Sequence, residues 1–141
     1  MAEPTVGRTV LVIDDEANAR RVIKLLLERE QFRVLTAANG DEGLILAKVE
    51  RPDVILLDVI MPKMNGYETL SRMKADTDIQ SIPVIIVTAK VTEHDIATSF
   101  KLGAVAHLEK PYETADLLLK IQMALQLRQP PQSGGGQSAG A

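Results

Sequence analysis

The chain has 141 residues, and its 16 lysines and arginines against 19 aspartates and glutamates give a formal net charge of −3. A mildly acidic chain of this length predicts one compact domain, and its aromatic content of 3% adds few stacking side chains, so direct nucleic-acid binding is not expected. Cysteine is absent, which excludes disulfides, thiolate metal sites and a thiol nucleophile.

The predicted elements alternate between strands and helices. In chain order they are a strand at 10–13, a helix at about 17–30, a strand at 32–37, a helix from 41, a strand at 54–57, a helix after Gly66, a strand at 84–87, a helix before Gly103, a strand at 104–108 and a helix around 117–125. The first, third and fourth strands are aliphatic without alternation, which is typical of central strands covered on both faces. The other two contain Arg33 or His107 and are expected at the edges. Val22 and Phe100 are expected on packed helix faces.

Five repeats of a strand followed by a helix predict an α/β fold with a doubly wound parallel sheet. With strands two and five at the edges the order is 2-1-3-4-5, and right-handed crossovers place the first and last helices on one face and the middle three on the other. The order reverses between strands one and three, so a ligand site is expected at their carboxyl ends. We assign residues 1–128 to this domain and 129–141, rich in proline, glycine and serine, to a flexible tail.

Polar side chains follow the predicted strands. Asp14 and Asp15 follow the first, Asp58 the third, Thr88 and Ala89 the fourth, and Glu109, Lys110 and Pro111 the fifth. Since the carboxyl ends of parallel strands meet at one edge, three carboxylates, a hydroxyl and an ammonium are expected to gather there. Three aspartates repel one another unless a cation lies among them, and one lysine supplies a single charge. A hard divalent ion such as Mg²⁺, which accepts oxygen ligands and keeps waters or phosphate oxygens, is the natural complement.

These residues resemble the receiver domain of two-component response regulators. The resemblance is carried by Asp14-Asp15, by Asp58 with Met61-Pro62 and Gly66, by Thr88-Ala89 and by Lys110-Pro111, and it extends from about Thr9 to Leu127. It implies a flavodoxin-like five-stranded fold, a histidine kinase or histidine phosphotransfer protein as phosphoryl donor, and a protein-binding surface that switches on phosphorylation. It implies no enzymatic activity beyond phosphorylation and dephosphorylation of the chain itself.

The resemblance also implies a role for each acidic residue. Asp58 is the phosphoacceptor. Asp15, Asp58 and the backbone carbonyl of Ile60 ligate Mg²⁺, while Asp14 acts mainly through metal-bound water. Lys110 pairs with Asp58 and then with the phosphate, whose oxygens it neutralises.

Switching residues are implied next to the site. Thr88 moves to bond a phosphoryl oxygen, and the loop at Ala89, the helix beyond it and the last strand and helix form the output face. Pro111 follows a cis peptide bond. His107 stands where the family usually has tyrosine or phenylalanine, so its coupling to the threonine is open, and imidazole would add pH sensitivity.

Three alternatives remain. An aspartyl-phosphate phosphohydrolase needs a second acid two residues after the nucleophile, where this chain has Ile60. A flavin carrier would need a phosphate cradle that the first loop lacks. A receiver-like scaffold that is never phosphorylated is the third. Ile60 and Lys90 flank the phosphoryl group in the family, and the bulk of Ile60 predicts slow autodephosphorylation.

The expected output is a protein contact of the receiver itself, because no DNA-binding helix pair or second domain is found after Leu127. No nucleic acid or membrane is expected as a partner, and homodimerisation through the output face is left open. The N-terminal residues 1–5 lack the apolar run of a signal peptide, so a soluble, cytoplasmic protein is expected.

Overall fold

The computed structural model describes residues 5–61, 65–89 and 92–127, and every predicted element is present in it. The elements are β1 (Thr9–Ile13), α1 (Ala17–Arg29), β2 (Arg33–Ala37), α2 (Gly40–Glu50), β3 (Val54–Leu57), α3 (Gly66–Ala75), β4 (Val84–Thr88), α4 (Glu93–Lys101), β5 (Ala106–Glu109) and α5 (Thr114–Leu127). Pro62, Lys90 and the predicted tail 129–141 lie outside the described residues.

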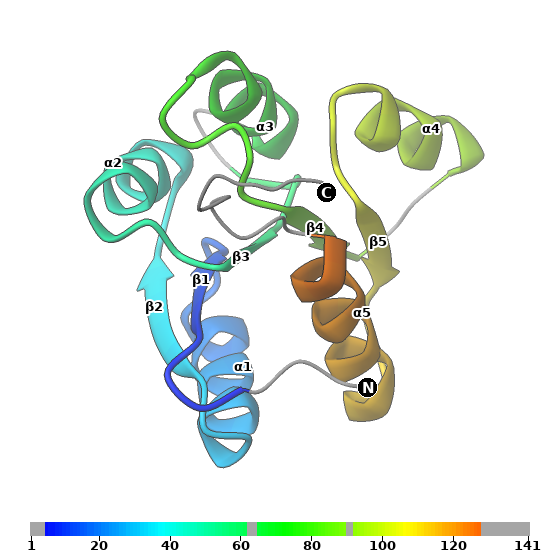
Figure 1. The fold of residues 1–141 in the computed structure, drawn as a ribbon. Coiled ribbons are helices and arrows are strands. Elements are labelled where there is room, and N and C mark those ends of the chain that lie inside the picture. Colours follow the sequence, from blue (N-terminus) through cyan, green and yellow to red (C-terminus); the bar gives the residue numbers. More distant parts are fainter. Residues whose placement is uncertain (1–4, 62–64, 90–91, 128–141) are drawn as a thin grey trace, which may run out of the picture.

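The strands form one parallel sheet in the order β2-β1-β3-β4-β5, as predicted (Figure 1). All residues of β1, β3 and β4 are buried, which explains their uninterrupted aliphatic sequences. The edge strands each carry an exposed charged residue, Arg33 in β2 and Glu109 in β5. Strand composition therefore identified the centre and the edges of the sheet correctly.

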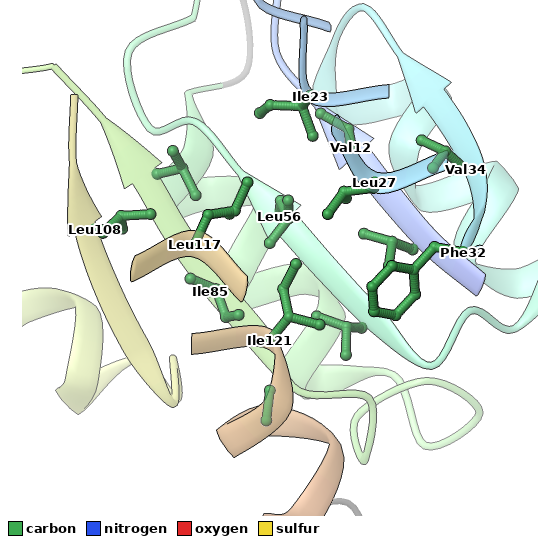
Figure 2. Close-up of a cluster of buried hydrophobic side chains, with 14 of the residues drawn as sticks. Val12, Ile23, Leu27, Phe32, Val34, Leu56, Ile85, Leu108, Leu117 and Ile121 are labelled. Carbon is green, nitrogen blue, oxygen red and sulfur yellow. The ribbon is translucent and has the colours of Figure 1, made fainter. Parts of the chain in front are cut away.

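Successive strand side chains point to opposite faces and build two cores. On one face, the sheet residues Val12, Leu56 and Ile85 pack with Ile23 and Leu27 of α1 and with Leu117 and Ile121 of α5 (Figure 2). On the other face, Leu11, Ile55 and Ile86 pack with Ala47 of α2 and with Leu70 and Met73 of α3. Figure 1 shows α4 beside α3 on this second side, so the predicted division of helices between the faces is confirmed.

Two side chains expected on packed helix faces are exposed instead. Val22 of α1 is 51% exposed, because the sheet covers a narrow stripe of this helix that includes Ile23 and Leu27. Phe100 of α4 is 47% exposed, because α4 lies at the edge of the sheet and buries one residue fully, Ser99. Among the described residues, no helix is both long and apolar enough to cross a membrane.

Candidate functional site

Three aspartates meet at the carboxyl edge of the sheet. Asp14 directly follows β1 and Asp58 directly follows the adjacent β3, and both are buried, with 3% and 7% of their surface exposed. The Asp58 amide donates to the Ile13 carbonyl at 2.9 Å, which continues the pairing of these strands. Asp15 is exposed, yet one carboxylate oxygen from each aspartate lies within 4.8 Å of the other two. The predicted acidic cluster is therefore present.

Lys110 reaches this cluster from the loop after β5. Its Nζ lies 2.6 Å from Asp14 Oδ2 and 3.3 Å from Asp58 Oδ2. Burial alone would lower the pKa of Lys110, but the Asp14 and Asp58 carboxylates outweigh burial and raise this pKa above the ordinary value for lysine. The expected pairing with Asp58 is present, and the shorter contact is with Asp14. Lys110 is thus a permanent ammonium between the two buried carboxylates.

Asp58 has partners on both carboxylate oxygens. Its Oδ1 accepts hydrogen bonds from Thr88 Oγ1 at 2.8 Å and from the Ile60 amide at 2.9 Å. Thr88 is the last residue of β4 and is fully buried, so its hydroxyl group faces Asp58 and not solvent. The other carboxylate oxygen, Oδ2, lies 3.3 Å from Lys110 Nζ.

The loop between β1 and α1 is fixed by Asp14 and by Arg20 of α1. Asp14 Oδ1 accepts from the Glu16 amide at 2.9 Å. Arg20 Nη1 donates to the main-chain carbonyl of Asp14 at 2.6 Å. Apolar periodicity assigns Arg20 to the wet side of α1, and it carries no signal for a side chain that turns back to a backbone carbonyl.

Gly66 permits a close approach between α3 and the chain that leaves β3. A Cβ atom built at this position would lie 2.4 Å from the Asp58 carbonyl oxygen and 2.3 Å from Val59 Cα. Asn65 caps the helix by accepting a hydrogen bond from the Glu68 amide. A side chain at position 66 is therefore sterically excluded, because the first turn of α3 packs on the backbone of Asp58 and Val59.

The acidic cluster opens into a hollow of about 540 Å³. Its lining comprises Asp14, Asp15, Glu16, Asp58, Ile60, Ala89 and Lys110. Ile60 is 57% exposed and Ala89 is also exposed, so these two residues lie where solvent reaches the site. Seven of the nine site residues predicted from sequence thus line this hollow or bond within it. Glu16, which the sequence analysis did not single out, also lines the hollow.

The other two predicted residues lie beside the hollow. Pro111 follows a cis peptide bond, as expected, and lines a neighbouring hollow of about 480 Å³ between α1 and the loop after β5. His107 lines a separate hollow of about 350 Å³ with residues of α4 and α5. Within the described residues its Nε2 is buried and has no hydrogen-bond partner. Burial lowers the pKa of His107, while the Asp95 and Glu109 carboxylates raise it in part.

The donor set fits a hard metal ion. Asp14, Asp15 and Asp58 offer oxygen atoms at a spacing that one ion can bridge, and the cluster contains no nitrogen or sulfur ligand among the described residues. Carboxylate oxygens are what Mg²⁺ and Ca²⁺ prefer. The cluster could therefore bind such an ion.

The family model of the response regulator receiver domain matches residues 10–122, a span that contains the acidic cluster and Lys110. The chain belongs to this family. Receiver domains act as phosphoryl acceptors in two-component systems and interact with histidine kinases or phosphotransfer proteins, and the chain shares this general role. The predicted fold and function class are thereby confirmed.

Individual relatives agree with this assignment. The protein PilH of Pseudomonas aeruginosa is 37% identical over 116 residues, which cover 82% of this receiver domain chain and 96% of PilH. The phosphate regulon transcriptional regulatory protein PhoB of the same organism is 33% identical over 91% of the chain, but the match spans 56% of PhoB. The solved structure of the chemotaxis protein CheY4 of Vibrio cholerae superposes with a TM-score of 0.81 at 30% identity, and covers 85% of this chain and 100% of that chain.

Proposed function

We propose that Asp58 is the residue that accepts the phosphoryl group. The observation that carries this assignment is its environment: a buried carboxylate at the base of an open acidic hollow, with Thr88 and the Ile60 amide on one oxygen and Lys110 on the other. Asp58 thus has a partly buried lysine and a fully buried threonine as partners. An aspartate held in this way is suited to nucleophilic attack on phosphorus.

The transfer would exchange one bond to phosphorus for another. An Asp58 oxygen forms the new O–P bond while the P–N bond of a phosphohistidine breaks, and its electron pair stays on the departing imidazole. Lys110 faces the incoming phosphoryl oxygens and offsets their charge. Thr88, whose hydroxyl now donates to Asp58 Oδ1, is placed to donate to a phosphoryl oxygen once that carboxylate is esterified.

We further propose Mg²⁺ as the ion of the acidic cluster, held by Asp15, Asp58 and the backbone carbonyl of Ile60, with Asp14 bonding through water. When bound, Mg²⁺ would neutralise phosphoryl oxygens that the three aspartates of the cluster would otherwise repel. Asp14, which is already paired with Lys110 at 2.6 Å, is suited to the outer role, while exposed Asp15 is open to direct ligation.

We propose a histidine kinase or histidine phosphotransfer protein in the cytoplasm as the donor, and a protein that binds α4, β5 and α5 as the downstream target. The hollow lined by Phe100, His107 and Met123 lies on that face, and a second copy of the chain is a further candidate occupant. The added phosphoryl group brings about −1.5 to −2 charges, enough to bias a loop between two arrangements.

The test is labelling with acetyl phosphate in MgCl₂, followed by intact mass. The wild type should gain one phosphoryl group, Asp58→Asn none, and the exposed control Asp41→Asn as much as the wild type. Equal labelling of Asp58→Asn would overturn the acceptor assignment. Absence of labelling in the wild type would favour the unphosphorylated scaffold, and sustained turnover of small phosphate esters would favour the phosphohydrolase.

A further inference from the structure

The exposed member of the acidic cluster has no side-chain support of its own. No described residue donates a hydrogen bond or forms an ion pair with the Asp15 carboxylate, whereas Asp14 and Asp58 each have several partners. Yet an Asp15 oxygen lies within 4.8 Å of oxygens of both other aspartates. The surrounding structure therefore acts on Asp15 through the two peptide groups that flank it, which set the direction of its Cα–Cβ bond.

Both of these peptide groups are fixed by hydrogen bonds. Arg20 contributes to the loop through its side chain and through its backbone amide. The carbonyl of the peptide between Asp14 and Asp15 accepts from Arg20 Nη1 at 2.6 Å. The N–H of the peptide between Asp15 and Glu16 donates to Asp14 Oδ1 at 2.9 Å. The Arg20 amide donates to the Glu16 carbonyl at 3.1 Å, so the arginine that holds the first peptide also belongs to the first turn of α1.

We propose that Arg20 is a positioning residue for the metal ion, a role that rests on the proposed function of the cluster. Its guanidinium fixes the plane of the peptide before Asp15 and so aims the Asp15 carboxylate into the cluster. Groups that orient a metal ligand without touching the metal typically change its affinity about 10–100-fold when they are removed. Arg20 acts on a ligand whose own carboxylate has no side-chain partner among the described residues.

Electrostatics alone predicts the opposite change in Mg²⁺ affinity when Arg20 is removed. Arg20 is a cation beside a cation site, so removing its charge lowers the repulsion that a bound Mg²⁺ feels and should strengthen binding. Loss of positioning should weaken binding instead. Arg21, the next residue of α1, is exposed and carries the same charge, so Arg21→Met provides a matched control for the change in charge.

The experiment is a titration of ¹⁵N-labelled protein with MgCl₂, followed through the amide signals of Asp15 and Glu16. Arg20→Met should bind Mg²⁺ about tenfold more weakly than the wild type. Its Asp15 and Glu16 signals should already be displaced without metal, while Arg21→Met should match the wild type in both respects. With acetyl phosphate, Arg20→Met should need more MgCl₂ for half-maximal labelling but approach the wild-type rate at saturation.

Unchanged or tighter Mg²⁺ binding in Arg20→Met would overturn the proposal, and so would equal weakening in Arg21→Met. Thermal unfolding without metal separates positioning from a general loss of structure. A folded Arg20→Met with weaker binding supports the proposal, and an unfolded one overturns it as a specific role. Failure of the wild type to bind Mg²⁺ or to be labelled would instead remove the proposed function itself.

Discussion

Replacing Lys110 by methionine should destabilise the metal-free domain strongly. The side chains of Asp14 and Asp58 are 4% and 9% exposed, and Lys110 Nζ lies 2.6 Å and 3.3 Å from their Oδ2 atoms. Methionine keeps the length of the stem but leaves both carboxylates without their cation. Removing one partner of a buried ion pair costs about 3–5 kcal/mol, and the lower value, about 3 kcal/mol, applies because the Lys110 side chain is 20% exposed.

The measurement is thermal unfolding at pH 7 in EDTA. A loss of about 3 kcal/mol in a domain of this size should lower Tm by about 10 °C. Lys101→Met, at the exposed end of α4, should stay close to the wild type. MgCl₂ should narrow the gap, because the metal ion neutralises the same carboxylates. Equal stability of Lys110→Met and the wild type in EDTA would refute the view that Lys110 offsets repulsion in this cluster.

Three further changes test the neighbouring residues. Thr88→Val removes the hydroxyl that donates to Asp58 Oδ1 and should cost about 1–2 kcal/mol in urea unfolding, whereas Thr88→Ser should retain most of the stability; equal losses would show that the bond is unimportant. The pKa of His107 is lowered in the folded state, so the unfolded chain takes up more protons and the wild type should lose stability as pH falls below about 6.5. In His107→Phe the urea midpoint should change less between pH 7 and 5 than in the wild type, whereas exposed His94→Gln should keep the wild-type change. A wild-type dependence of the midpoint on pH in His107→Phe would contradict this. Ile60→Ala should speed decay of the phosphorylated protein, measured by intact mass after removal of acetyl phosphate, because a smaller side chain at the solvent edge admits the attacking water; unchanged decay would mean that Ile60 does not obstruct it.

The central strands were predictable because burial on both faces favours an apolar residue at nearly every position. β1, β3 and β4 have no position that faces water, and their sequences contain aliphatic residues throughout the interior of each strand. Helix faces were less predictable. The apolar stripe of α1 extends beyond the area that the sheet covers, so Val22 is exposed although its neighbour Ile23 is buried. Sequence periodicity reports the direction of a face, but the extent of the surface opposite it is a tertiary property.

The acidic site was predictable for a related reason, because the carboxyl ends of adjacent parallel strands lie at one edge of the sheet independently of the loop conformations. Asp14, Asp58 and Thr88 lie at the ends of adjacent strands, and the parallel register brings them together. The contacts of long side chains were not predictable to the same degree. Lys110 lies nearer to Asp14 than to Asp58, and Arg20 bonds a carbonyl six residues earlier, because both depend on loop geometry that no sequence period encodes.

The charge on the hollow gives a physical reason why the proposed phosphorylation of Asp58 would require a metal ion. Its lining residues include four acidic residues and one lysine, Lys110, which together have a formal charge of −3 before any ligand enters. The proposed transfer to Asp58 would replace one carboxylate charge by a phosphoryl group that carries more, so a site without a cation would repel the group that it accepts. A divalent cation would offset this negative charge, and it would bind most readily where its carboxylate ligands already point into the hollow. The buried aspartates are aimed by Thr88 and Lys110, and the exposed one depends on the peptide that Arg20 holds.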